Sequence, residues 1–470
     1  MLRLPRRFAS TLLKVENPYT FQTVAEIPYT TLEESYEFIN KSNDFFKTWK
    51  LTSLDERISV LDKALLYFKE NKQEIAKEIT TQMGKPIRQS LQEVDNMIVF
   101  SNELKSLARD ALSDEVIEDT ENSYKKITKI PIGPVLILSD YTYPLMSIAS
   151  GLVPAILSGN TAILKHSVYS PLCGTRFHEA FKHAGADYLV KDLMLQINEI
   201  PEFFGSPKLS YVHFTGKVES GKEIYKSLAE KNMIDIGLFL SGDNMIYISA
   251  EADLDKCAAE IGKKAMENAG QSCFNFKKLL IHRSVHDDFI ERAQAQIMSL
   301  TMGDPMDEMT TLGPMADPDN MEFLQNMIQQ AVANSSEVIC GGSPTNDETG
   351  NGRFYEPTII TDLDDHDSLF IGEFIGPVLA ISPVESDEEA LSRFNNDPYL
   401  FASGIYSKDK SKAIEFINKI KGPRVLINEC SIRHPRLPWN GSLKAGKGVM
   451  YSSHGYKPFY QLKSYSYTFG

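Results

Sequence analysis

Strand-like and helix-like segments alternate along the middle of the chain, and this alternation constrains the fold more than any other feature of the sequence. The apolar, strand-like runs are 135–139, 161–165, 188–197 and 209–216, and helical patterns begin at Pro144 and cover 171–185 and 219–231. Such alternation predicts an open parallel sheet with right-handed crossovers. A second region of the same kind runs from about residue 246 to 397, so two α/β lobes are expected.

Other segments follow different periods. Residues 31–112 repeat apolar residues at i, i+3, i+4 and i+7, which predicts helices. Residues 113–130 form two alternating polar-apolar segments, a pattern typical of a β-hairpin, and 460–469 alternates like a further strand. The predicted fold class is therefore α/β, with two open-sheet lobes and a small β appendage.

Charge and cysteine content exclude several classes of protein. The 470 residues include 49 Lys+Arg and 63 Asp+Glu, a net charge of −14. A nucleic-acid binder or an anionic-membrane binder needs a basic face, so neither is expected. The longest apolar region, 141–157, is interrupted by Pro, Ser and Gly and falls short of the ~20 residues of a membrane span. Five cysteines are too few, and odd in number, for a disulfide framework.

The first fourteen residues form a distinct segment. Residues 1–14 hold four basic residues, Ser10, Thr11 and no acid. This composition is typical of a mitochondrial presequence, so the mitochondrial matrix is the expected location. If the segment is only a basic tail, the cytoplasm is the alternative.

One cysteine stands in a position suited to chemistry. Cys273 follows a Gly-containing turn between a predicted helix, 254–267, and a predicted strand, 277–282. A thiol at such a turn faces a cleft more readily than one within a helix, and nearby amides can lower its pKa and hold an oxyanion. A lone cysteine is otherwise usually a small buried hydrophobe. The other four, which lie in apolar patterns, are interpreted in that way: Cys173, Cys257, Cys340 and Cys430.

A phosphate-binding turn is indicated at Gly216, where a strand-like run passes into a helix whose first amides can hold a pyrophosphate. Residues 216–223 nearly match a P-loop, but Glu223 stands where Mg²⁺ binding needs a hydroxyl. The nine histidines show no metal-ligand spacing, so no metal site is expected.

The segment NAGQSC, at 268–273, resembles the aldehyde dehydrogenase superfamily. Five other segments resemble it in the family's order and approximate spacing: SGNTAILK, FTG (214–216), GRFYEPTI (352–359), GEFIGPV (372–378) and LPWNGSLKAGKG (437–448). The resemblance implies a dinucleotide-binding domain from 15–112 and 133–239, a catalytic domain from 240–445, and an appendage from 113–132 and 446–470. By the same resemblance the appendage joins the chain into a homodimer or homotetramer.

The resemblance also implies roles for single residues. Cys273 matches the nucleophile, which adds to the carbon of a small aldehyde and gives a thiohemiacetal that passes hydride to NAD or NADP. Lys165 matches a lysine that hydrogen-bonds the adenosine ribose, and Glu373 matches the acid that holds the nicotinamide ribose. The expected cofactor-binding residues are Lys165, Ser167, Gly216, Lys217, Gly242 and Glu373.

Two catalytic positions depart from the family's pattern. Thr142 stands where an Asn amide completes the oxyanion hole, and losing one such donor typically costs ~10²–10³ in rate. Phe239 replaces the glutamate that activates water, and a missing general base typically costs ~10²–10⁴. On the cofactor side, Val168 replaces an acid that grips the ribose. Lys217, beside the phosphates, is expected either to compensate for the missing acid or to bind a 2′-phosphate. The sequence therefore allows either NAD or NADP as the cofactor.

Three hypotheses follow. In the first, the chain oxidises an aldehyde through Cys273, slowly because water attack on the thioester is impaired. In the second, the acyl group passes to a thiol such as coenzyme A, which is itself a good nucleophile, so a glutamate base is less needed. In the third, the chain is a binding or scaffold protein that keeps the fold without the activity.

Overall fold

The computed structural model describes residues 12–272, 274–431 and 433–468. Most of the predicted presequence, 1–14, lies outside the described residues. Residues 12–14 belong to strand β1 (Leu12–Glu16), which pairs antiparallel with β2 (Thr23–Pro28). Leu13 and Val15 pack with Met194 in a small apolar cluster, which fixes this hairpin on the first lobe.

Four helices follow the hairpin, as the periodicity of 31–112 predicts. They are α1 (Leu32–Trp49), α2 (Leu54–Glu70), α3 (Lys72–Met83) and α4 (Ile87–Leu112). Thr31 and Ser53 begin α1 and α2 with capping boxes, in which each hydroxyl accepts from the amide three residues on and the glutamate there returns the bond. The buried face of α4 packs against α5 (Pro144–Leu157).

The first lobe contains a six-stranded sheet in the order β20-β9-β8-β5-β6-β7. Its strands are β5 (Pro134–Leu138), β6 (Thr161–Lys165), β7 (Val190–Asp192), β8 (Tyr211–Gly216), β9 (Asp235–Leu240) and β20 (Gly446–Lys447). The five strands from the middle of the chain are parallel, and helices α6 (Pro171–His183) and α8 (Val218–Lys231) connect them. The predicted alternation is confirmed, although β7 is shorter than the apolar run at 188–197.

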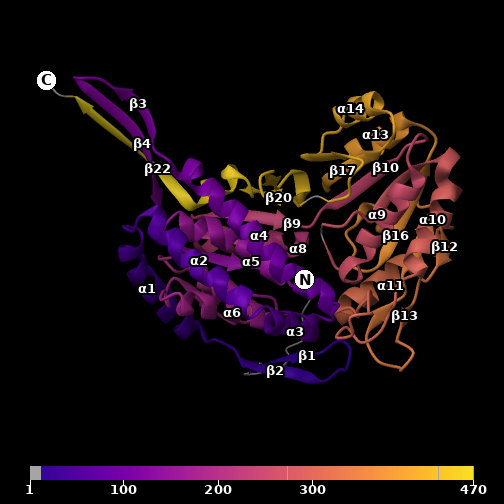
Figure 1. Ribbon diagram of the computed structural model, residues 1–470, viewed down its shortest axis with the longest axis horizontal. Helices are drawn as coiled ribbons and strands as arrows, with labels where there is room; N and C mark the ends of the chain where they lie inside the picture. The colour runs from indigo at the N-terminus through magenta and orange to yellow at the C-terminus, as the bar shows by residue number, and fades with distance from the viewer. Residues whose placement is uncertain (1–11, 273, 432, 469–470) are drawn as a thin grey trace.

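The second lobe contains a seven-stranded sheet in the order β12-β15-β16-β11-β10-β17-β18, parallel except for β12. Its strands are β10 (Asp243–Ile248), β11 (Lys278–His282), β12 (Glu337–Cys340), β15 (Thr358–Thr361), β16 (Val378–Val384), β17 (Leu400–Tyr406) and β18 (Arg424–Ile427). Its main helices are α9 (Leu254–Met266), α10 (His286–Met298), α11 (Pro318–Ala333), α13 (Asp387–Asn396) and α14 (Lys410–Ile417). Figure 1 shows this lobe, in pink and orange, beside the first.

The predicted hairpin forms a projecting arm. Strands β3 (Glu115–Asp119), β4 (Ser123–Pro131) and β22 (Tyr460–Thr468) make an antiparallel sheet in the order β22-β4-β3. Figure 1 shows this arm standing away from both lobes. Several of its apolar side chains are exposed, among them Val116, Ile117 and Leu462.

No helix in the described ranges is long and apolar enough to cross a bilayer. The apolar region at 141–157 forms α5, which is almost wholly buried in the first lobe. Its interruptions are structural: Pro144 begins the helix, and Gly151 lies against the ring of His213, where an added Cβ would come within 2.9 Å.

Candidate active site

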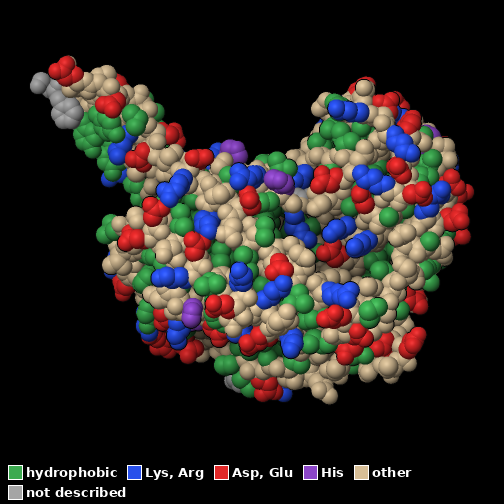
Figure 2. All heavy atoms as spheres, in the orientation of Figure 1, with side chains coloured by type: hydrophobic (Ala, Val, Ile, Leu, Met, Phe, Trp, Pro, Cys, Tyr) green, Lys and Arg blue, Asp and Glu red, His purple; other side chains and the backbone are tan. Residues whose placement is uncertain are grey.

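A cavity of about 70 Å³ lies where the two lobes meet, at the ends of β8 and β9. We call it the central cavity. Residues from both lobes line it, including Asp140, Thr142, Gly216, Phe239, Phe274 and Glu373. Ligands of open α/β sheets bind at the carboxyl ends of the strands, which is where this cavity lies. Figure 2 shows lysine and arginine side chains around the hollow between the lobes.

Cys273 lies outside the described residues, but both of its neighbours are placed. Ser272 is buried, and Phe274 lines the central cavity. The preceding turn has three left-handed residues in a row, Asn268, Ala269 and Gly270, with φ values of 56°, 53° and 63°. A Cβ at Gly270 would lie 1.9 Å from the carbonyl oxygen of Gly376, so only glycine allows this close approach.

Long-range hydrogen bonds fix this turn to both lobes. The Asn268 side-chain amide donates to the carbonyl of Thr142 at 2.9 Å. Lys277 Nζ donates to the carbonyls of Gly270 and Phe374, at 2.9 and 2.7 Å. The segment that carries the thiol is therefore tied to the loop at Thr142 and to the segment that carries Glu373.

A buried ion pair is hydrogen-bonded to the backbone of the loop at 140–145. Lys85 and Glu93, each with 1% of the side chain exposed, pair with one another. Lys85 Nζ donates to the carbonyl of Thr142 at 3.1 Å, and Glu93 Oε1 accepts from the amide of Leu145 at 3.0 Å. The pair thus holds both ends of the turn that presents Thr142.

The two divergent positions face the same space. The Thr142 hydroxyl donates to Asp140 Oδ1 at 3.0 Å, and the Thr142 amide donates to the same atom at 2.8 Å. The hydroxyl is therefore directed to Asp140. Phe239 lies on β9, only 4% exposed, with its ring 4.6 Å from that of His213.

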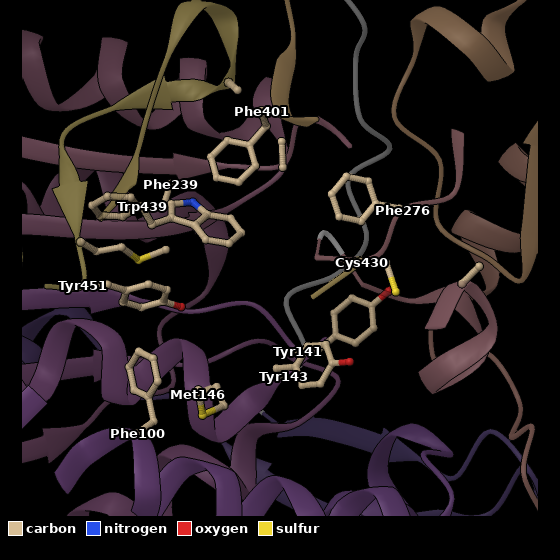
Figure 3. Close-up of a cluster of buried hydrophobic side chains, with 14 of the residues drawn as sticks. Phe100, Tyr141, Tyr143, Met146, Phe239, Phe276, Phe401, Cys430, Trp439 and Tyr451 are labelled. Carbon is tan, nitrogen blue, oxygen red and sulfur yellow. The ribbon is translucent and has the colours of Figure 1, made fainter. Parts of the chain in front are cut away.

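The wall around Phe239 is aromatic. Trp439 packs edge-on against Phe274 at 4.7 Å between ring centroids and lies 5.9 Å from the ring of Tyr451. Figure 3 shows the rings of Phe239, Trp439 and Tyr451 on one side of this cluster. This apolar wall suits an aldehyde carbon chain and offers no proton acceptor at position 239.

A second and larger cavity, of about 550 Å³, continues from the central cavity along the interface. We call it the interlobe groove. Lys217, Val218 and Glu219 line it at the start of α8, which has no side-chain cap. Uncapped amides at a helix N-terminus suit a pyrophosphate. Lys217 Nζ reaches across the groove and donates to Asn320 Oδ1 at 2.6 Å.

Glu373 lies between the two cavities and lines both. It accepts from the Ser241 hydroxyl at 2.5 Å. Burial raises the pKa of its carboxyl, against the opposing effects of Ser241, Lys277 and Lys217. Gly242 lines the interlobe groove, where an added Cβ would lie within 2.9 Å of atoms of residues 399, 401 and 445, so it also serves close packing.

Lys165 and Ser167 line neither cavity. Lys165 ends β6 at the same sheet edge, and burial lowers the pKa of its ammonium to about 8. Asp192, at the end of β7, is its charged neighbour, and burial raises the pKa of that carboxyl to about 7. The side chain of Val168 packs against the apolar cluster that contains Leu13, so its role here is structural.

The residues at this edge fit a dinucleotide. The uncapped start of α8 suits phosphates, Lys165 Nζ makes no hydrogen bond within the described part of the chain, and Glu373 stands beside the central cavity. The described residues contain no cluster of three metal-binding side chains. The arrangement fits a nucleotide-dependent oxidoreductase.

Arg433, which sequence reasoning missed, lines neither cavity but lies beside Phe274, which lines the central cavity. Its guanidinium lies 3.9 Å from the ring centre of Tyr143 and 4.8 Å from that of Phe274, the residue after Cys273. Within the described ranges it has no hydrogen bond and no ion pair. The signal was weak, because Arg433 belongs to none of the segments that resemble the family.

Comparison with known proteins agrees with this geometry. The aldehyde dehydrogenase family matches residues 7–465. A 3-sulfolactaldehyde dehydrogenase of Priestia aryabhattai is 27% identical over 93% of this chain and 91% of its own length. A succinate-semialdehyde dehydrogenase [NADP(+)] of Mycobacterium leprae is 26% identical over 95% of this chain and 98% of its own.

Solved structures show the same architecture. Succinic semialdehyde dehydrogenase from Streptococcus pyogenes, in complex with NADP⁺, superposes with a TM-score of 0.91 at 25% identity and covers 96% of this chain and 99% of its own. The chain therefore belongs to the aldehyde dehydrogenase family. It is an oxidoreductase of the kind that acts on aldehydes with NAD(P) as acceptor.

Proposed function

We propose that the chain oxidises a small aldehyde with an anionic tail, through a thioester on Cys273. The observation that carries this proposal is the tie between the turn at 268–270 and the loop at Thr142, which holds the segment before Cys273 against the central cavity. NAD or NADP, when bound, supplies the hydride acceptor. The chain's own residues hold the aldehyde chain against Trp439 and Phe239 and exclude water with that aromatic wall.

Arg433 supports the anionic tail. A guanidinium between two rings, in no ion pair with a carboxylate of the described residues, can receive a carboxylate or sulfonate, in competition with the nearby charges of Glu267 and Glu93. It lies 4.8 Å from the ring centre of Phe274, the residue that follows Cys273 in the chain. The names of two relatives, which act on 3-sulfolactaldehyde and on succinate semialdehyde, point to the same class of substrate.

Changing Arg433 to Met is expected to lower kcat/KM for a four-carbon aldehyde with a terminal carboxylate by about 10–10²-fold, because one charge-assisted contact is lost. Turnover of butanal should stay the same. Arg436→Met is the matched control, since Arg436 already binds Glu103 at 2.8 Å. Equal losses on both aldehydes would contradict a role for Arg433 in recognising the tail.

Release of the acyl group to coenzyme A is the second candidate, and Phe239 is the observation that favours it, because a thiol acceptor needs no base at that position. The test uses purified protein, an aldehyde panel and both cofactors, with and without coenzyme A. NAD(P)H formation supports aldehyde oxidation, and its dependence on coenzyme A supports the acylating route. No NAD(P)H with any aldehyde would leave the binding or scaffold hypothesis.

Two further proposals concern the setting of the enzyme. The basic segment 1–14 supports location in the mitochondrial matrix, with the cytoplasm as the alternative; a fluorescent fusion of this segment tests it. The exposed apolar residues of the arm support a homodimer or homotetramer that buries them. Sedimentation of the purified protein measures which of these forms exists.

A further inference from the structure

The central cavity contains an acid besides Glu373. Of the described residues that line this cavity, two carry carboxylates, Asp140 and Glu373. Glu373 accepts from Ser241 and also lines the interlobe groove, which places it on the cofactor side. Asp140 follows β5 and remains partly exposed between the buried residues Ser139 and Tyr141.

Asp140 is held in one orientation. Its Oδ1 accepts from both the amide and the hydroxyl of Thr142, at 2.8 and 3.0 Å. The hydroxyl that replaces the family's oxyanion amide therefore positions a carboxylate. Phe239 lines the same cavity as Asp140 and occupies the position at which the family has its base. Position 239 therefore holds no carboxylate that could compete with Asp140 for the water.

We propose that Asp140 is the general base that activates water for release of the acyl group, with Thr142 as its positioning residue. This inference rests on the proposed function, which supplies the thioester. Water gives one proton to Asp140 Oδ2 while its oxygen bonds to the thioester carbon. The C–S bond then breaks, Cys273 leaves as a thiolate, and the product is a carboxylic acid. Asp140 returns its proton to solvent.

The substitution Asp140→Asn tests the assignment, because the new amide oxygen can still accept from Thr142 and so keeps the loop. We expect one equivalent of NAD(P)H per site in a rapid burst, as in the wild type. Steady-state acid release should then be about 10²-fold slower, the effect of losing a general base. Asp187→Asn is the control, since its carboxylate binds Lys191 at 3.2 Å and lines neither the central cavity nor the interlobe groove.

A second variant sharpens the test. The double variant Asp140→Asn with Phe239→Glu has a carboxylate in the same cavity again. Its steady-state rate of acid release should be about tenfold higher than that of Asp140→Asn alone. Unchanged steady-state release in Asp140→Asn would overturn the proposal. So would a burst that falls in proportion to the steady state, because Asp140 would then act before the thioester forms. A wild type that forms no NAD(P)H from any aldehyde would instead refute the proposed function.

The wild-type pH profile gives a readout that needs no variant. Burial raises the pKa of Asp140, with the charge of Glu93 adding to the effect and bonds from Thr142 opposing it. A base with a raised pKa is active above that pKa, so acid release should fall as the pH falls through it, while the burst persists. Lys85, which pairs with Glu93, and Glu373 and Lys217, which line the same cavity, are the other charged groups around it. A burst and a steady state with the same pH dependence would count against Asp140.

Discussion

Replacement of Cys273 by alanine is expected to abolish NAD(P)H formation from every aldehyde, with a loss on the order of 10⁴-fold or more. Removal of a covalent nucleophile eliminates the thiohemiacetal and the thioester together, and the described residues that line the central cavity include no second thiol. Rates of NAD(P)H formation for wild type and variant, at saturating aldehyde, provide the measurement.

The other cysteines supply the control. Cys173 and Cys257 have 1% and 0% exposure. Burial raises the pKa of the Cys257 thiol to about 12 and raises that of the Cys430 thiol, so both stay protonated and react slowly. Iodoacetamide at neutral pH should therefore label Cys273 first. Cys257→Ala should keep full activity, and activity that survives in Cys273→Ala would rule out the thiol mechanism.

Glu93→Gln is expected to lower the free energy of unfolding by about 3–5 kcal/mol, because it leaves the Lys85 ammonium buried without its anion. The amide oxygen of Gln can still accept from the amide of Leu145, but Lys85, which donates to the carbonyl of Thr142, loses the anion that fixes it, so the turn that presents Thr142 should loosen as well. Urea unfolding followed by circular dichroism measures the first effect. The steady-state rate of acid release measures the second.

A neighbouring ion pair, whose acid lies on α4 like Glu93, provides the comparison. Asp95 binds Lys72 at 2.6 Å, but their side chains are 47% and 29% exposed. Asp95→Asn should therefore cost less than about 1 kcal/mol. The double variant Lys85→Met with Glu93→Leu should recover most of the lost stability, since paired apolar side chains replace a buried ion pair well. Equal costs for Glu93→Gln and Asp95→Asn would show that burial of the first pair has no energetic weight.

Local patterns predicted the elements, because each depends on residues close in the chain. The alternation at 133–239 and the hairpin at 113–130 are confirmed as sheets. The hairpin of β1 and β2 was missed: its strands are short, and what holds it is a distant residue, Met194. Cys430 was interpreted as part of a regular element and is buried in a loop instead, so its burial was inferred correctly and its local structure was not.

The sequence predicted several residues of the site, because their types and their order along the chain resemble the family's. It did not predict the contacts between them. Thr142 and Phe239 were recognised as departures from the family's pattern, and the structure places both beside the central cavity. The residues that fix the loop of Thr142 lie far away in the chain. Lys85 contacts Thr142 across 57 positions and Asn268 contacts it across 126, and no local period reports such contacts. The role of Cys273 stays a prediction, to be decided by the alanine variant.

Strand β20 has a consequence for how the protein is made. Residues Gly446–Lys447 pair with Leu238 and Phe239, so the sheet of the first lobe gains its last strand from the final 25 residues of the chain. A sheet that is otherwise complete by Leu240 must then wait, during synthesis at roughly 5–20 residues per second, for more than two hundred further residues to leave the ribosome. The wall that carries Phe239 thus stays open in the nascent protein, and a truncated product cannot acquire a finished catalytic centre.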